Sequence, residues 1–132
     1  MSQAGSPILY SIVESPTHPD FSSLYRQLGI TEVQFKAMRK AMASLKRQPP
    51  DLVVAEFFYG YANNYAGVNI SNLDVFLFSL QKYAPQARVV VLVEKKERQY
   101  VDALYKIFPL HDVLLQPATG QDMRAALVAC LS

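Results

Sequence analysis

The strongest constraint on the fold is an unbroken run of apolar residues at positions 88–93. Its sequence, Arg-Val-Val-Val-Leu-Val, shows no alternation of polar and apolar side chains. A strand with one face in water alternates, whereas a strand covered on both faces is continuously apolar. Residues 8–13 and 51–57 are also largely apolar and lack a clear alternation. The sequence therefore predicts a sheet with helices packed on both faces.

Segments with helical periodicity separate these apolar runs. Further strands are predicted at 31–35 and 112–115, and helices at 21–28, 38–47, 72–81, 97–108 and after Thr119. Strands that alternate with helices favour a parallel sheet with right-handed crossovers. The predicted fold is α/β: a doubly wound three-layer α/β/α sandwich, flavodoxin-like, with five parallel strands in the order 2-1-3-4-5.

Several local signals fix the ends and faces of the predicted helices. Gly29 stands where a helix C-cap belongs, and Thr119 with Asp122 has capping-box spacing. Ser71 and Asn72 are expected to cap the third helix. In the fourth helix the expected core-facing side chains are Val101, Leu104, Tyr105 and Phe108.

Length and composition bound the class of protein. The 132 residues, 51% hydrophobic, predict a single domain over 1–132, with a flexible tail at 1–6 and no output domain. The net charge of +2 is spread evenly along the chain and does not favour nucleic-acid binding. No segment approaches the roughly 20 apolar residues of a membrane helix, and the first 25 residues contain no Lys or Arg. We expect a cytoplasmic protein that binds neither nucleic acid nor membranes.

The spacing of glycine, cysteine and histidine argues against several kinds of enzyme. Glycines at 5, 29, 60, 67 and 120 match no dinucleotide loop, Walker loop or nucleophile elbow. Cys130 lies in an apolar helical pattern and is expected to be a buried thiol. His18 and His111 are isolated, so no zinc site is predicted. We expect no catalytic residue, no metal and no cofactor.

The run Pro50-Asp51-Leu52-Val53-Val54-Ala55-Glu56 resembles the third strand of bacterial response-regulator receiver domains, the CheY-like superfamily. In that family a Pro-Asp-Leu-Val sequence leads into the phospho-accepting Asp. The resemblance covers nearly the whole chain, including Gly29, residues 89–93 as the fourth strand, and residues 114–119 before the last helix. It implies the receiver fold and a role in bacterial two-component signal transduction.

The resemblance also locates five functional positions, and this chain departs from the family at each. The acidic Mg²⁺-binding pair, the acceptor Asp, the strand-four Ser or Thr, the switch aromatic and the Lys are matched by Glu14-Ser15, Glu56, Val93, Val113 and Gln116, respectively. Phosphoryl transfer depends on a metal and on cations that neutralise developing charge. The implied protein is a pseudo-receiver. Its Glu56 faces water or a Lys, retains a weak Mg²⁺ site with Glu14, or resembles a permanently phosphorylated Asp.

An uncharged aromatic segment follows Glu56, where receivers usually have a short loop. Its five rings belong to Phe57, Phe58, Tyr59, Tyr61 and Tyr65. Tyrosine combines an apolar ring with a polar tip and suits recognition surfaces. The alternative is that these rings cover the sheet edge, and the sequence leaves both interpretations open.

Two surface features point to association with other molecules. Val75, Phe76 and Phe78 lie in one apolar run that no single core-facing stripe buries, so we expect an exposed ring and a homodimer. Arg39, Lys40, Lys46 and Arg47 form the outer surface of the second helix. They are either a patch for an acidic partner or nucleic acid, or an ordinary solvated face.

Three functions are consistent with the sequence. The favoured one is a phosphorylation-independent protein–protein interaction module whose partner the sequence does not name. The second is a small-molecule-binding domain that uses the aromatic segment 57–70 as a pocket wall. The third is an enzyme of flavodoxin-like architecture. This one has the least support, because residues 14–19 contain no glycine phosphate cradle.

Overall fold

The computed structural model describes residues 6–13, 20–59 and 71–131. Residues 1–5 of the tail expected at 1–6 lie outside the described residues. The same is true of four predicted site residues, Glu14, Ser15, Tyr61 and Tyr65. The strands are β1 (Ile8–Ile12), β2 (Thr31–Phe35), β3 (Leu52–Glu56), β4 (Arg88–Val93) and β5 (Asp112–Leu115). The helical segments are α1 (Ser22–Gln27), α2 (Met38–Ser44), α3 (Asp74–Tyr83), η1 (Lys95–Glu97), α4 (Arg98–Val101), η2 (Asp102–Lys106) and α5 (Gly120–Leu131).

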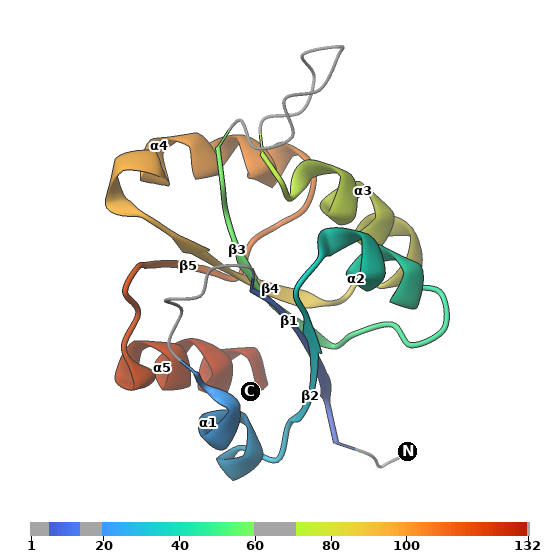
Figure 1. Ribbon diagram of the computed structural model, residues 1–132, viewed down its shortest axis with the longest axis vertical. Coiled ribbons are helices and arrows are strands. Elements are labelled where there is room, and N and C mark those ends of the chain that lie inside the picture. The colour runs from blue at the N-terminus through green and yellow to red at the C-terminus, as the bar shows by residue number, and fades with distance from the viewer. Residues whose placement is uncertain (1–5, 14–19, 60–70, 132) are drawn as a thin grey trace.

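The sheet confirms the predicted architecture. Its strand order is β2-β1-β3-β4-β5, and every neighbouring pair is parallel. Helices α2, α3 and α4 lie on one side of the sheet, and α1 and α5 lie on the other (Figure 1). Among the described residues, no helix is long and apolar enough to span a bilayer.

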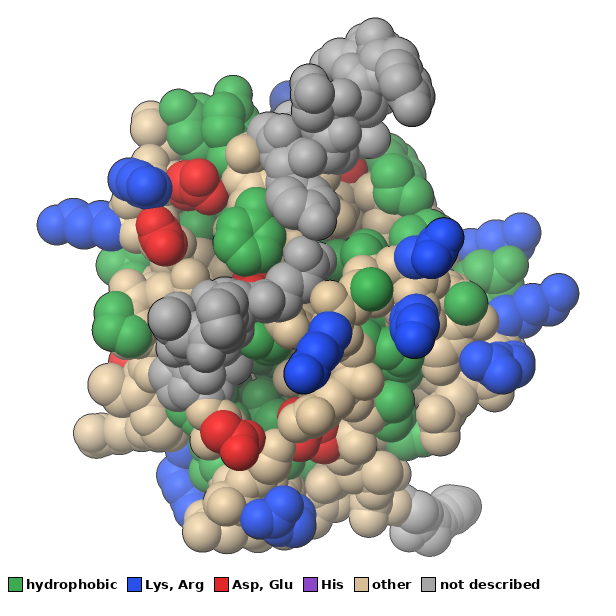
Figure 2. Space-filling model, in the orientation of Figure 1, with side chains coloured by type: hydrophobic (Ala, Val, Ile, Leu, Met, Phe, Trp, Pro, Cys, Tyr) green, Lys and Arg blue, Asp and Glu red, His purple; other side chains and the backbone are tan. Residues whose placement is uncertain are grey.

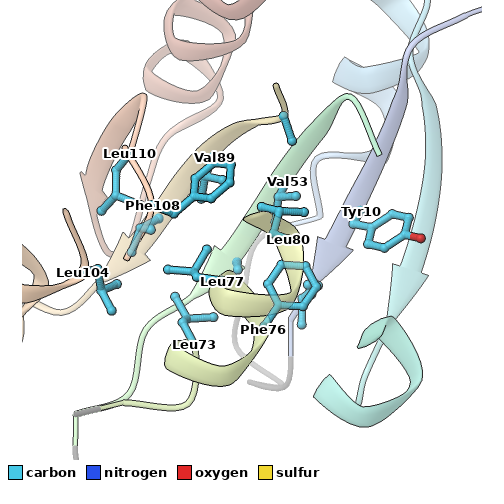
Figure 3. Close-up of a cluster of buried hydrophobic side chains, with 14 of the residues drawn as sticks. Tyr10, Val53, Leu73, Phe76, Leu77, Leu80, Val89, Leu104, Phe108 and Leu110 are labelled. Atoms are coloured by element: carbon cyan, nitrogen blue, oxygen red, sulfur yellow. The ribbon is translucent and has the colours of Figure 1, made fainter. Parts of the chain in front are cut away.

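Alternate residues of the central strands enter two separate cores. Val53 and Ala55 of β3 pack under α2, α3 and α4, whereas Leu52 and Val54 pack against α1 and α5. Strand β4 divides in the same way, because successive side chains of a strand point to opposite faces. Figure 3 shows the first of these cores, with side chains from β1, β3, β4, α3 and η2. This arrangement explains the absence of a polar and apolar alternation in the sequence.

The segment at 97–108 differs from the single helix that was predicted. It consists of a four-residue α4 between the 3₁₀ segments η1 and η2. Val101, Leu104 and Phe108 are buried as expected, but Tyr105 is 48% exposed and does not face the core. With three residues per turn, the side chains of residues 101 and 104 fall in line, and residue 105 is rotated away from them.

Both predicted terminal signals are confirmed. Gly29 follows α1 with a φ of +75°, a conformation that glycine adopts without steric cost. At the start of α5, the Asp122 N–H donates to Thr119 Oγ1 at 3.0 Å, and the Thr119 N–H lies 3.5 Å from Asp122 Oδ2.

A buried tyrosine attaches α2 to the sheet. The Tyr10 side chain is fully buried, and its ring packs against Phe35 with a centroid distance of 4.8 Å. Its hydroxyl is hydrogen-bonded with Ser44 Oγ at 2.9 Å and with the Gln48 carbonyl oxygen at 2.5 Å. Burial raises the pKa of this hydroxyl, so it stays protonated at neutral pH. These two hydrogen bonds join β1 to the C-terminal end of α2 and to the residues that follow it.

Replacing Tyr10 with Phe should destabilise the fold while leaving the core packed. The Ser44 hydroxyl, which is itself buried, loses its partner, and we expect a loss of about 1–2 kcal/mol in unfolding free energy. Urea denaturation followed by circular dichroism measures this loss. The matched control is Tyr105→Phe at an exposed ring, for which unchanged stability is expected. Equal midpoints for the two variants would contradict the anchoring role of Tyr10.

Candidate functional site

Three of the five positions named by the resemblance meet at the carboxyl edge of the sheet. Glu56 ends β3 and is 1% exposed. The Gln116 side-chain amide donates to Glu56 Oε2 at 3.2 Å, from the segment that follows β5. Val93 ends β4 and is fully buried, and its carbonyl oxygen accepts the Gln116 N–H at 2.8 Å. Glu56 is therefore held by protein groups, and the alternative of a carboxylate facing water is wrong.

Val93 and Gln116, the two matched positions described beside Glu56, carry no charge. Val93 presents no donor to an incoming oxyanion, and Gln116 presents an uncharged amide where a cation would be needed. Within the described ranges, no group of three or more His, Cys, Asp and Glu side chains forms a potential metal site. Val113 is half-buried and packs against the α2–α3–α4 core.

Asn72 joins the two chain segments that emerge at this edge. Its side-chain amide donates to the Glu56 carbonyl oxygen at 2.8 Å, and its Oδ1 accepts the Phe58 N–H at 2.7 Å. The Asn72 N–H in turn donates to the Phe58 carbonyl oxygen at 3.3 Å, and Tyr59 pairs with Ser71 in an antiparallel bridge. One side chain thus satisfies two backbone groups beside Glu56.

The cap of α3 differs in part from the prediction. Ser71 does act near the helix start, since its Oγ accepts the Leu73 N–H at 3.1 Å. Its partner is Asp74, whose Oδ1 accepts both the Ser71 N–H at 2.9 Å and the Ser71 hydroxyl at 2.7 Å. Asn72, the other expected cap, instead bonds back to β3. The Ser-x-x-Asp spacing of 71–74 was the available signal for this pairing.

The described rings of the aromatic segment differ in exposure. Phe57 is 2% exposed and belongs to the core, so its predicted role in an interaction loop is wrong. Its N–H donates to the Leu92 carbonyl oxygen, and this bond extends the sheet by one residue and turns the ring inward. Phe58 is half-buried. Tyr61 and Tyr65 fall among the residues that are not described.

Tyr59 is the described residue of this segment that presents an aromatic surface. Its ring stacks on Tyr100 with a centroid distance of 3.6 Å and an interplanar angle of 14°, and it remains 47% exposed. Its N–H donates to Glu97 Oε1 at 3.1 Å. The stacked pair connects the end of β3 to the η1–α4 segment.

The predicted self-association face on α3 is only partly exposed. Phe76 is fully buried and was wrongly assigned to that face, because it shares the inward stripe of α3 with Leu77 and Leu80. Val75 and Phe78 are 45% and 57% exposed. The expectation that at least one ring of this run lies at the surface is confirmed by Phe78.

Comparison with known proteins identifies the fold. No protein-family model and no curated protein matches the sequence. A Thermotoga maritima response regulator is 16% identical, with a TM-score of 0.72 over 96% of this chain and 98% of the other. The BeF₃-activated DrrB receiver domain is 12% identical, with a TM-score of 0.73 over 96% and 97%. An adenylate cyclase from Rhodopirellula baltica is 14% identical, with a TM-score of 0.69 over 96% and 87%.

These similarities establish the receiver fold predicted from the 50–56 run. Many of the similar structures are response-regulator receiver domains. At such low identities the likeness extends to the fold alone, because one fold carries many functions. What this chain does must be argued from its own residues.

Removing the Asn72 side chain should destabilise the protein through the backbone. Asn72→Ala leaves the Glu56 carbonyl and the Phe58 N–H without their side-chain partner, and we expect a loss of about 2–4 kcal/mol. Thermal and urea unfolding measure this loss. The control is Gln99→Ala at an exposed side chain, with expected unchanged stability. If Asn72→Ala is as stable as Gln99→Ala, the prediction is wrong, because water then replaces both hydrogen bonds.

The single cysteine should be chemically inert, as the sequence predicted. Cys130 is 8% exposed on α5, and burial raises its pKa to about 11. Because the thiolate is the reactive form, labelling by Ellman's reagent at neutral pH should be far slower in the folded protein than in urea. Stoichiometric labelling at the same rate in both conditions would contradict the buried position.

Proposed function

We propose that this protein is a phosphorylation-independent, receiver-like module that acts through protein–protein contacts in bacterial signal transduction. The observation that carries the proposal is the buried Glu56 side chain bonded to Gln116. The acceptor position of the receiver fold is thereby occupied by a carboxylate that the protein itself satisfies. A chain of this kind transmits information by what it binds.

The site residues support this assignment on chemical grounds. An attacking carboxylate must reach a phosphoryl donor, and Glu56 is shielded from solvent. The transferred group also needs cationic stabilisation, which neither Val93 nor Gln116 supplies. A Glu56 that imitates a phosphorylated Asp is compatible with the same geometry, because its longer side chain reaches the residue at the lysine position.

We further propose that the aromatic surface around Tyr59 is one contact region of the module. Tyr59 and Tyr100 offer stacked rings at the edge that carries Glu56. The competing small-molecule function used the segment 57–70 as a pocket wall, and residues 60–70 of it lie outside the described residues. Two shallow hollows of about 390 and 360 Å³ share Gln86 and Arg88, and neither is lined by Glu56 or Tyr59.

Incubation with acetyl phosphate and Mg²⁺ should leave the intact mass of the protein unchanged. The reason is that Val93 and Gln116 supply neither a hydroxyl nor a cation beside Glu56, and beryllofluoride should likewise produce no change in the amide NMR spectrum. A receiver domain with an intact acidic site, treated in parallel, is the positive control. A one-phosphoryl adduct that maps to Glu56 would overturn the proposal.

A further inference from the structure

The outer surface of α2 and its flanks carries a dense group of cations. Lys and Arg side chains gather over α2 in Figure 2, while Asp and Glu lie mainly over other parts of the visible face. The residues of this group, all exposed, are Lys36, Arg39, Lys40, Lys46 and Arg47. Between positions 36 and 50 the sequence contains no carboxylate.

Helix α3 lies beside α2 on the same side of the sheet and continues this surface (Figure 1). Its inward stripe is used by the core, so Val75, Phe78 and Lys82 point away from the sheet at a spacing of three and four residues. We call the combined surface the α2–α3 face: the five cations above together with Lys82, Val75 and Phe78. It combines exposed apolar side chains on α3 with positive charge on α2 and at the end of α3.

Among the described residues, no exposed carboxylate of α2 or α3 balances the charge of this face. It holds six of the 13 Lys and Arg residues of the chain. The one carboxylate of α2 and α3 is Asp74, which is 2% exposed and bonded to Ser71. Among the described residues, the ion pairs Lys96–Glu94 and Arg98–Asp102 involve none of the six. The rest of the chain holds the other seven cations and ten of the 11 carboxylates. The net charge of +2 is therefore distributed unevenly between this face and the rest of the chain.

The face is held rigidly by the core beneath it. Ala41 and Leu45 are fully buried, and the Tyr10 hydroxyl is bonded to Ser44 and Gln48 at the end of α2. A rigid surface loses little conformational freedom on binding, which favours a specific partner. The large apolar side chains of α2, Met38 and Met42, pack inward. The helix therefore has no apolar side free to enter a lipid bilayer in the manner of interfacial helices.

We propose that the α2–α3 face binds an acidic protein partner, whose carboxylates meet the six cations and whose apolar side chains cover Val75 and Phe78. This inference rests on the proposed interaction function and names the chemistry of one partner. Protein interfaces commonly place an aromatic anchor in a desolvated centre and charges at the rim. Complementary rim charges raise the association rate and exclude partners of the wrong sign.

A second copy of the chain fits this face poorly. An isologous dimer places the same patch on both subunits, and here it would bring cations against cations. The homodimer expected from the apolar run on α3 would therefore have to overcome that repulsion. It is treated below as an outcome of the experiment.

The test is a binding titration with a probe of defined chemistry. A fluorescein-labelled helical peptide built from repeats of Glu-Glu-Leu-Leu-Glu-Glu-Ala is titrated with the full chain and followed by fluorescence anisotropy. Reversing two cations, R39E with K40E, should weaken binding by about tenfold or more, equivalent to about 1.4 kcal/mol. F78S should weaken binding of this peptide and leave unchanged the binding of a matched peptide with Ser in place of Leu.

The matched control reverses two exposed cations elsewhere, K95E with K96E, and makes the same change in net charge. Its binding should stay within about twofold of the unaltered protein if the contact is local, because distant exposed charges are screened by salt. Circular dichroism confirms the fold of each variant. Equal weakening by both charge reversals would overturn the proposal, since net charge alone would then govern binding.

Competition identifies the alternative occupants. If phosphatidylglycerol vesicles or duplex DNA bind the protein more tightly than the peptide does, and R39E/K40E abolishes that binding, the proposed acidic protein is wrong. The occupant of the face is then a lipid or a nucleic acid. Light scattering that shows a dimer abolished by F78S would replace it by a second copy. A phosphoryl adduct on Glu56 would overturn the proposed phosphorylation independence while leaving this titration unaffected.

Discussion

The structure depends on the burial of β3 and β4 on both faces. Their successive residues are divided between two cores, and each core needs its own layer of helices. A parallel arrangement follows, because each crossover places a helix over the sheet before the chain returns. The carboxyl ends of β3, β4 and β5 are thereby brought to one edge, and side chains as far apart in sequence as Glu56 and Gln116 form a hydrogen bond.

The same edge shows how the fold accommodates a buried carboxylate at the end of β3. A buried carboxylate is costly unless it is hydrogen-bonded, and Gln116 supplies a bond that requires no metal. Asn72 donates to the Glu56 carbonyl oxygen, so both the side chain and the backbone of Glu56 are hydrogen-bonded. Glu56 and Val93, at the ends of β3 and β4, are thus part of the internal packing.

The fold was predictable from the sequence because its determinants are local and periodic. The unbroken run at 88–93, the glycine after α1 and the Thr119–Asp122 spacing each report a structural feature within a few residues. Tyr105 was misplaced because a 3₁₀ segment changes the helical phase without a clear change in composition. Phe57 and Phe76 were misplaced because burial depends on which face of an element meets the core. Asn72 was assigned to the wrong partner because its bonds to residues 56 and 58 arise from tertiary structure.

The charge distribution illustrates the same distinction between sequence and surface. Along the chain, cations and carboxylates are evenly mixed, which argued against nucleic-acid binding by overall charge and left open whether the cations at 39–47 form a patch for an acidic partner. In the fold, the chain from 36 to 50 presents its five cations on α2 and its flanks, and α3 adds Lys82 while Asp74 is buried. Since interactions between exposed charges extend only about 10 Å at ordinary ionic strength, the local grouping matters more than the sum. A nearly neutral protein can therefore carry a locally cationic surface.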